Sequence, residues 1–373
     1  MDKDHLRFAF VGDVCLPFLK GTPAGVPEFK SWSTIRREIG KHDFFVGNLE
    51  CCLVDERCSP EARKQPMATP VTAGSFLHDI GFSDLCLANN HSLDCGPGAL
   101  TTTRECLASY GIRGFGAGPD LHEAEEPVFA ERNGCKIAFL GACDKSEYYA
   151  SDSCAGIAPL EKIRLGERVR AAAAQSDLVV TMLHADLEFS DVPGRWRQRL
   201  SRWLVEQGSH LVIQHHPHVL QGIEEYQGGV IAYSLGNFIF QLHGNKYQEH
   251  QTGVFDSMVL IVDVDMRGEK PVLAHRIIPL LIGSDHLPHH MTERSRGKAS
   301  ARLQVLSSLV AERSVHRKIW FRRCRLEAVS RLSHLYYAFR RGDIASGNRT
   351  LHQLLTCQED RRWMRGLASL GYL

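Results

Sequence analysis

Several apolar stretches of the sequence end in side chains that can bind a metal ion or transfer a proton. The candidate strands at 7–11, 42–46, 84–88, 178–183 and 210–213 are each followed within two residues by Asp, Asn or His. In layered α/β folds the carboxyl ends of strands, and the loops after them, form the ligand crevice. The side chains expected to converge there are Asp13, Asn48, Glu50, Asn90, His91, His184, His216 and His218.

The mixture of imidazole and carboxylate in this set indicates which metals would suit it. Such a mixture favours Zn, Mn or Fe, whereas an oxygen-only set would suit Mg or Ca. The most specific part is His216-Pro217-His218, because two imidazoles two residues apart point the same way on an extended backbone. A single histidine at a strand end, or Gly12-Asp13 alone, is more typical of a solvated side chain or a turn. The combination of five strand ends is what predicts a metal centre.

The elements that must position these residues alternate along the chain. Short buried strands separated by helices indicate an α/β layered fold. Two hairpins interrupt the alternation, at 128–142 with Asn133-Gly134 at the turn and at 220–240. This mixture predicts two packed sheets with helices outside them, rather than one doubly wound sheet. The helices are expected at 31–40, 97–110, 160–175 and 193–207, and closing strands at 253–265 and 271–282.

Composition excludes several classes of protein. The 373 residues are 43% hydrophobic and 23% charged, too apolar for a chain that is disordered as a whole. No apolar run approaches the roughly 18 residues of a membrane span, and the first residues lack the apolar core of a secretion signal. We therefore expect a cytoplasmic protein without a membrane span. The 12 cysteines include no CxxC pair, so mostly free and buried thiols are expected.

Charge divides the chain into an acidic body and a basic C-terminal part. Residues 291–373 contain 17 Lys and Arg against 6 Asp and Glu, a net charge of +11, while residues 1–290 carry −10. A polar segment at 283–298 is expected to be a linker between a domain at 1–282 and a basic helical region at 299–373. We expect the arginines of that region to pack on the acidic body. Binding of an acidic polymer is an alternative, and nucleic acid is a less favoured partner.

Six motifs of the body resemble those of the bacterial CapA family. This family, also called the poly-γ-glutamate capsule-synthesis family, belongs to the calcineurin-like metallophosphatase superfamily. ANNHSLDCG and YSLGNFIF are the specific motifs, whereas short ones such as GD or NLE mean little alone. The motifs are GDVCL (12–16), GNLE (47–50), ANNHSLDCG (88–96), HADLEF (184–189), HHPHVLQGIE (215–224) and YSLGNFIF (233–240).

The resemblance implies a four-layer α/β/β/α sandwich with a two-metal site between its sheets. It implies that Asp13 is the carboxylate ligand of the first metal and Asn90 an amide ligand. His184 and His216 are implied as ligands of one metal, and His218 of the other. Glu50 or Asn48 would bridge the metals, and a carboxylate favours Glu50. His91 is implied as the acid that protonates the leaving group. Asp94 either orients His91 or caps the helix beginning at Pro97, and Asn237 either serves in a turn or supports a metal ligand.

Two departures from the family pattern affect these implications. Cys15 stands where the superfamily's first motif, Asp-x-His, has histidine, so the first metal is held weakly unless Cys15 binds as a thiolate. The usual His-Trp-Gly-x-Glu-Tyr motif is His-Ala-Asp-Leu-Glu-Phe here, which keeps His184 and Glu188 but changes the aromatic wall around the substrate.

The function expected from these observations is metal-dependent hydrolysis. Two divalent transition metals, Mn, Fe or Zn, would activate a water that attacks a phosphoester or amide bond in a small molecule or an acidic polymer. The first alternative is a non-catalytic binding or assembly component of poly-γ-glutamate capsule synthesis. The second is a nucleic-acid phosphoesterase that uses the basic region.

Overall fold

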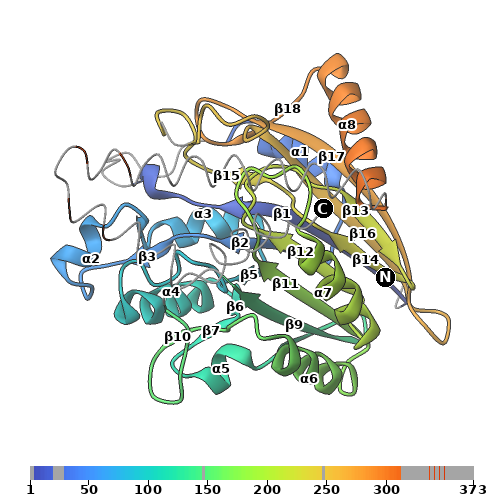
Figure 1. Ribbon diagram of the computed structural model, residues 1–373, viewed down its shortest axis with the longest axis horizontal. Coiled ribbons are helices and arrows are strands. Elements are labelled where there is room, and N and C mark those ends of the chain that lie inside the picture. Colours follow the sequence, from blue (N-terminus) through green and yellow to red (C-terminus); the bar gives the residue numbers. More distant parts are fainter. Residues whose placement is uncertain are drawn as a thin grey trace.

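Two β-sheets lie face to face at the centre of the computed structural model (Figure 1). The structure describes residues 4–19, 29–144, 148–245 and 248–311, and the single positions 336, 340, 344 and 348. The first sheet has the strand order β18-β17-β16-β1-β2-β5-β6, with β15 also paired to β1. Its strands are β1 (His5–Val14), β2 (Phe44–Leu49), β5 (Asp84–Cys86), β6 (Arg113–Phe115), β15 (Asn237–Ile239), β16 (Asp256–Asp265), β17 (Val272–Ile282) and β18 (Pro288–His290).

The second sheet has the order β13-β14-β12-β11-β9-β8. Its strands are β8 (Val128–Arg132), β9 (Cys135–Cys143), β11 (Leu178–His184), β12 (Leu211–His215), β13 (Ile223–Tyr226) and β14 (Gly229–Ala232). Two small pairs complete the strands, β3 (Cys52–Val54) with β4 (Ala68–Pro70) and β7 (Ala117–Gly118) with β10 (Gly156–Ile157). The helices are α1 (Trp32–Ile39), α2 (Pro60–Lys64), α3 (Ala73–Ile80), α4 (Pro97–Ser109), α5 (Leu121–Glu125), α6 (Lys162–Ala173), α7 (Arg195–Glu206) and α8 (Glu293–Ala311), with a 3₁₀ turn η1 (Pro17–Leu19).

Side chains along the strands of the second sheet point alternately to its two faces, so the sheet packs against the first sheet on one face and against helices on the other. Phe139 of β9 faces the first sheet, where its ring centroid lies 5.7 Å from that of Phe44 and 5.6 Å from that of Phe115. Its neighbour Leu140 points the other way and packs in a separate cluster with Val169 of α6. Because successive side chains of a strand point to opposite faces, one sheet fills both clusters. The α/β class and the four-layer α/β/β/α arrangement expected from the sequence are confirmed.

The hairpin expected at 220–240 is shorter than predicted. Its arms are β13 and β14, and the chain then leaves this sheet, so that β15 pairs in parallel with β1 of the other sheet. The crossing requires glycine: a Cβ added to Gly12 would lie 2.0 Å from the carbonyl oxygen of Gly236. The hydrogen bond from the amide of Asp13 to that same oxygen, 3.0 Å long, fixes the contact. Residues 233–240 therefore join the sheets at the ends of β1 and β12.

The segment expected to be a linker, 283–298, is instead part of the folded body. It contains β18, which pairs with β17, and the first turns of α8. Ser31 fixes β18 to the beginning of α1, because its hydroxyl donates to the carbonyl of Pro288 and lies 3.1 Å from Nδ1 of His289. The polar composition of this segment reflects an edge strand and a helix start, which also tolerate polar residues.

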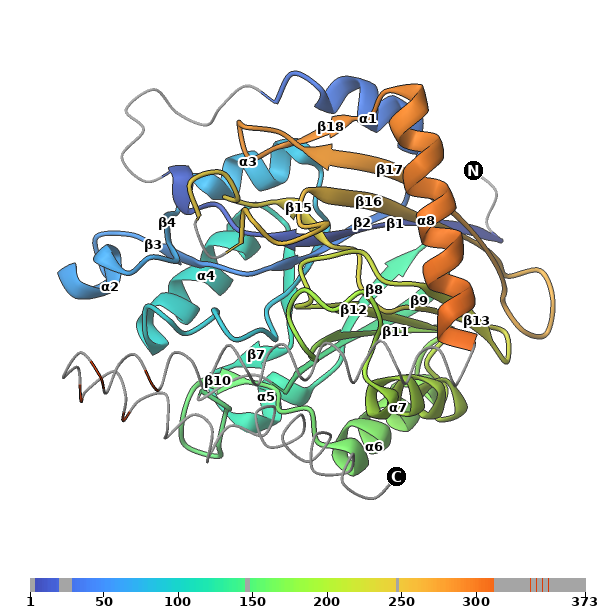
Figure 2. The same ribbon diagram turned by 45° about the horizontal axis from the view of Figure 1, so that its top comes forward.

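Helix α8 crosses the ends of both sheets, and Figure 2 shows it running from β17 and β18 towards β13. Two arginines of the basic region pair with acids of the body: Arg296 with Glu38, and Arg302 with Asp256 at 2.7 Å. The expected packing of basic residues on the acidic body is thus observed for α8. The remaining clusters of that region, Arg317-Lys318, Arg322-Arg323-Arg325 and Arg341, lie outside the described residues.

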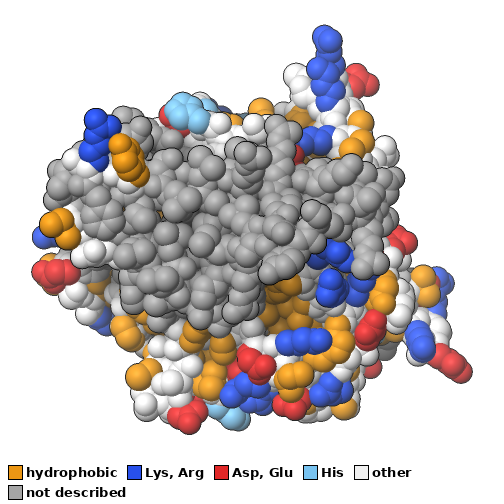
Figure 3. Space-filling model, viewed as in Figure 1, with side chains coloured by type: hydrophobic (Ala, Val, Ile, Leu, Met, Phe, Trp, Pro, Cys, Tyr) orange, Lys and Arg blue, Asp and Glu red, His pale blue; other side chains and the backbone are white. Residues whose placement is uncertain are grey.

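Charges of opposite sign also alternate on the surface. Over α5 and α6, at the bottom of Figure 3, Lys and Arg side chains lie beside Asp and Glu side chains. Arg164 pairs there with the buried Glu125 at 2.7 Å. Within the described part of the chain, no helix is long and apolar enough to cross a membrane. All ten cysteines among the described residues are free thiols, and eight of them are buried.

Candidate metal centre

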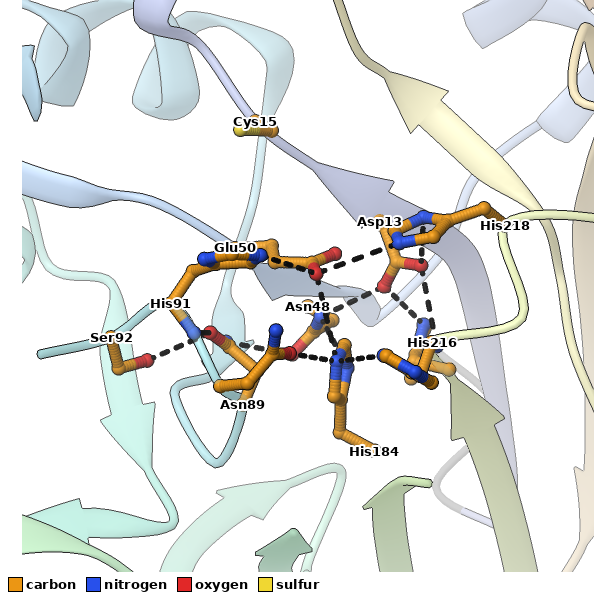
Figure 4. A network of polar contacts seen from close by, with 12 residues as sticks. Asp13, Cys15, Asn48, Glu50, Asn89, His91, Ser92, His184, His216 and His218 are labelled. Carbon is orange, nitrogen blue, oxygen red and sulfur yellow. Dashed lines mark hydrogen bonds and ion pairs between the residues drawn. The ribbon is translucent and has the colours of Figure 1, made fainter. Parts of the chain in front are cut away.

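Glu50 lies at the centre of the polar cluster between the two sheets. It follows β2 directly, and its amide donates to the carbonyl of Val14 at the end of β1, 2.8 Å away. The side chain is completely buried, yet neither carboxylate oxygen has a hydrogen-bond donor among the described residues. Figure 4 shows Glu50 between His91 on one side and Asp13 with His218 on the other. A buried carboxylate left in this state is costly unless a cation balances it, so the site fits a metal.

Three side chains from separate loops meet on one side of Glu50. Nε2 of His184, at the end of β11, lies 2.7 Å from Oδ1 of Asn90 and 3.0 Å from Nδ1 of His216. The same nitrogen lies 3.6 Å from Oε1 of Glu50. The parallel pairing of β11 with β12, with His184 opposite His215, brings these two strand ends together. The structure thus brings Asn90 together with His184 and His216, the two histidines that the family resemblance implied for one metal.

Asp13 and His218 lie on the other side of Glu50. Oδ2 of Asp13 is 3.4 Å from Nδ1 of His218, and Nε2 of His218 is 3.7 Å from Oε1 of Glu50. The second oxygen of Asp13 is held separately: Nδ2 of Asn48 donates to Oδ1 at 2.8 Å, and Nδ1 of His215 lies 3.2 Å from it. Two overlapping groups have ligand atoms within 4.8 Å of one another, and Glu50 belongs to both: Glu50 with His216 and His218, and Asp13 with Glu50 and His184.

Asn237 fixes the orientation and the tautomer of His218. The Asn237 amide nitrogen faces the carbonyls of His218 and Val254, so its Oδ1 is the acceptor. Nδ1 of His218 lies 2.9 Å from that oxygen and must therefore carry a hydrogen. The lone pair of His218 is consequently on Nε2, the nitrogen that faces Glu50. Asn237 thus contacts a candidate ligand in the way a supporting residue does.

His91 and Asp94 form a second pair at the more open side of the cluster. Nδ1 of His91 lies 2.7 Å from Oδ2 of Asp94, and Nε2 lies 3.9 Å from Oε1 of Glu50. The side chains of His91 and Asp94 are 27% and 26% exposed, whereas the carboxylate and histidine ligands are buried, so solvent reaches the site here. Asp94 therefore contacts His91 as an orienting residue would, and the alternative that it caps α4 is wrong, because Gly96 occupies the cap position.

The sequence-based prediction assumed an extended backbone for His216 and His218, but the turn that carries them is not extended. The φ angles of His216 and His218 are 94° and 56°, in the left-handed region that non-glycine residues rarely adopt. Their ring centroids lie 5.8 Å apart. Backbone strain of this kind persists where surrounding contacts impose it, and it is concentrated at functional sites.

Burial and charge shift the pKa values of the cluster in opposite directions. Burial, reinforced by the charge of Asp13, raises the pKa of Glu50 well above its usual range. Burial lowers the pKa of His184 well below its usual value, despite the opposing charge of Asp13. Burial would also raise the pKa of Asp13, but the hydrogen bond from His215 and the nearby imidazoles lower it overall. The neutral imidazole and the ionised Asp13 are the forms that bind metals.

Two further candidates are placed differently. Cys15 lies apart from the cluster in Figure 4, and its thiol contacts the sulfur of Met67 at 3.6 Å. A hydrogen bond with Cys51, together with burial, raises the pKa of the Cys15 thiol well above its usual range, which opposes ligation as a thiolate. Glu188 is half-buried, and its charge contributes to the raised pKa of Glu50, so it belongs to the surroundings of the site.

Sequence reasoning missed two residues that support the cluster. Asn89 donates to the carbonyl of Leu49 at 2.8 Å and accepts from the amide of His91 at 3.1 Å, which connects the β2 end to the turn bearing His91. His215 contacts Asp13 as described above, although only its neighbour was assigned a role. Each of them adjoins an assigned residue, Asn90 or His216, and that adjacency in the sequence was the available sign.

Searches against curated proteins find relatives with capsule-related names. The chain is 32% identical over 245 residues to "PGA biosynthesis protein CapA" of Bacillus subtilis (strain 168), covering 64% of each chain. It is 29% identical over 207 residues to "Capsule biosynthesis protein CapA" of Bacillus anthracis, covering 53% of this chain and 50% of that protein. The chain therefore spans between half and two thirds of the length of these two relatives.

Solved structures with a similar arrangement share little sequence with this chain. A hypothetical protein from Thermus thermophilus aligns with a TM-score of 0.44 at 14% identity, covering 74% of this chain and 99% of that one. The 5'-nucleotidase from Candida albicans aligns with a TM-score of 0.43 at 11% identity, covering 84% of this chain and 58% of that one.

A family model supplies the strongest relation. It matches residues 7–242, which extend from β1 to just beyond β15 and include every candidate ligand of the cluster. The chain belongs to the family described as bacterial capsule synthesis protein PGA_cap.

Proposed function

We propose that this protein is a metal-dependent hydrolase acting on a phosphoester or amide bond at the cluster around Glu50. The observation that carries the proposal is the Glu50 carboxylate, which is fully buried, lacks hydrogen-bond donors among the described residues and is shared by two ligand groups. A carboxylate has two oxygens and can bridge two cations. The Asn48 amide, by contrast, already donates to Asp13, so Glu50 is the bridging residue in this proposal.

The remaining ligands divide between two sites in this proposal. Each of the two groups that share Glu50 combines residues of both sites, so the division rests on the contacts of His184 with Asn90 and His216 and on that of Asp13 with His218. Asn90, His184 and His216 would hold one divalent transition metal, and Asp13 with His218 would hold the other. Metals bound there supply polarisation of the scissile bond and a water that is nucleophilic at neutral pH. Cys15 adds no ligand in this arrangement, so the site of Asp13 and His218 has the smaller donor set and is the weaker one.

His91 supplies the proton for the leaving group. A carboxylate only accepts hydrogen bonds, so Asp94 holds the hydrogen on Nδ1 of His91 and leaves Nε2 directed into the site. Protonated at Nε2, His91 can donate to the departing oxygen or nitrogen. Positioned acids of this kind contribute about 10²–10⁴-fold to the rate.

Metal content and turnover test the proposal together. The full chain, purified without chelator, is expected to contain one to two equivalents of Mn, Fe or Zn by elemental analysis, and His216→Ala should lose metal. Hydrolysis of aryl phosphate esters and of γ-glutamyl amides is then compared for wild type and His91→Ala. His91→Ala should retain metal and lose turnover.

Two results would contradict this function. Absence of metal, even after incubation with Mn²⁺, Fe²⁺ or Zn²⁺, would show that the cluster around Glu50 is not a metal centre. Undiminished turnover by His91→Ala would show that His91 is not the acid that protonates the leaving group.

A second candidate is a binding or assembly role in capsule synthesis without turnover. The names of the two relatives favour it, because they refer to biosynthesis. It is also favoured by Cys15, which stands where the first motif of the superfamily has a histidine ligand and contacts Met67 instead. It predicts that the metal-loaded chain binds poly-γ-glutamate, measured by co-sedimentation, and leaves its chain length unchanged after prolonged incubation.

A further inference from the structure

A buried arginine connects the loops that carry the three histidine ligands. Arg197 of α7 is a charged side chain but is fully buried, on the same helix face as the apolar Leu200 and Leu204. Its Nη1 donates to the carbonyl of Ala185 at 2.5 Å, and its Nη2 donates to Oε1 of Gln221 at 2.5 Å and to the carbonyl of Tyr233. One side chain therefore contacts three segments that are far apart in the sequence.

Each of these segments contains or adjoins a residue of the candidate metal centre. Ala185 directly follows His184. Gln221 lies three residues after His218 in the turn that begins at His216, and Tyr233 begins the stretch that leads to Asn237. The guanidinium is thus bound to the backbone or side chains of every loop through which the second sheet reaches the cluster.

The contacts of Arg197 are extended by a second layer of hydrogen bonds. Oδ2 of Asp186 lies 3.3 Å from Nε of Arg197 and accepts from the amide of Gly194, at the beginning of α7. Asp186 has a φ of 91°, so the loop after His184 is held in a conformation that a free loop would not prefer. Gln221 in turn donates to the carbonyl of Ser190 at 2.6 Å, which connects the same loop to the turn of His216 and His218.

The stability of the fold alone does not explain why a charged guanidinium occupies this buried position. Burial lowers the pKa of Arg197, an effect that the charge of Asp186 opposes, and buried ion pairs are often no more stable than apolar residues of the same volume. Arginine offers what an apolar residue cannot, namely a planar fork that binds several acceptors in fixed directions.

We propose that Arg197 is a positioning residue that sets the spacing of His184 and His216 for the metal bound between them. The proposal rests on the metal centre proposed above. Asp13 lies in β1 and Glu50 follows β2, both strands of the other sheet, and neither is among the groups that Arg197 contacts. His218 shares the turn that contains Gln221, so loss of Arg197 should affect both metal sites. The site of His184 and His216 should be weakened more, because both of its histidines lie on loops that Arg197 contacts. Residues that orient metal ligands through the protein typically change metal affinity by about 10–100-fold when replaced.

Titration with Co²⁺ alone tests this role, because its visible absorption reports both affinity and ligand geometry. The chelator-stripped full chain is titrated as wild type, Arg197→Met, Arg197→Lys and Arg202→Met. The last is the matched control: Arg202 lies on the same helix but pairs with Glu224 of β13 instead. Melting in chelator reports folding of each variant separately from metal binding.

Arg197→Met should bind Co²⁺ about 10–100-fold more weakly with an altered absorption band, whereas Arg202→Met should match wild type. Arg197→Lys, which keeps the charge but not the fork, should show a smaller loss of affinity with the same altered band. If Arg197→Met does not fold, Arg197→Lys decides. Wild-type affinity and spectrum in either folded Arg197 variant would overturn the positioning role, while failure of wild type to bind Co²⁺ would overturn the metal centre itself.

Discussion

Replacing Glu50 by glutamine should have opposite effects on stability with and without metal. In chelator, the wild-type carboxylate is buried without donors and lies near the charge of Asp13. Glutamine leaves a polar group at this position but removes its negative charge, and we expect this relief of the buried charge to be worth about 1–3 kcal/mol. At about 2 °C per kcal/mol, the low end for large domains, Glu50→Gln should melt roughly 2–6 °C above wild type under these conditions.

Metal should reverse this order. A ligand that binds only the folded state at 1,000 times its Kd adds about 4.1 kcal/mol, which corresponds to roughly 8 °C here. Wild type should gain this increment. Glu50→Gln, whose amide cannot bridge two cations, should gain little or nothing, so the two melting curves should exchange places on addition of Mn²⁺ or Zn²⁺.

Thermal melts of both proteins in chelator and in excess metal provide the measurement. Glu125→Gln is the control, because Glu125 is also buried but accepts two hydrogen bonds from Arg164, at 2.9 and 2.7 Å. That variant should lose stability equally in both conditions. The reasoning would be refuted if Glu50→Gln were less stable than wild type in chelator, because Glu50 would then be satisfied within the protein and need no cation.

Three other substitutions examine separate parts of the site. Asp94→Ala removes the acceptor at Nδ1 of His91, so kcat should fall at least about 10-fold while the metal content by elemental analysis stays unchanged. Asn237→Leu removes the acceptor at Nδ1 of His218 and should weaken binding of the second metal equivalent by about 10–100-fold in a metal titration. Gly12→Ala would place a methyl group 2.0 Å from the Gly236 oxygen, so the metal-free protein should lose at least about 1–3 kcal/mol of stability in denaturant unfolding.

Local sequence patterns were sufficient for most strands and helices of the body. The strand expected at 178–183 corresponds to β11, and the helix expected at 193–207 corresponds to α7, because each has its own periodicity and end residues. The role of β15 was not predictable in this way. Its pairing with β1 depends on a contact between Gly12 and Gly236, and nothing local distinguishes it from the second arm of a hairpin.

The site was predictable to a similar extent. Residues such as His184 and His216 have a metal-binding side chain at a strand end, and the structure brings them together. Arg197 lies in the first turn of a helix, where arginine is most often a solvated side chain, so its burial depends on three distant segments that only the fold assembles. Similarly, an extended backbone was assumed for His216 and His218, although tertiary contacts hold both in the left-handed region.

The position of β1 also affects how the protein can be made. The first strand of the chain is interior to its sheet and pairs with β16, with His5 opposite Asp265. On a ribosome adding roughly 5–20 residues per second, β1 would wait tens of seconds for this partner, with its apolar face exposed to chaperones and to other nascent chains. The family model ends at residue 242, but a gene fragment cut there would omit β16 and leave residues 5–10 of β1 as an open edge. An expression fragment of this protein should therefore extend through β17.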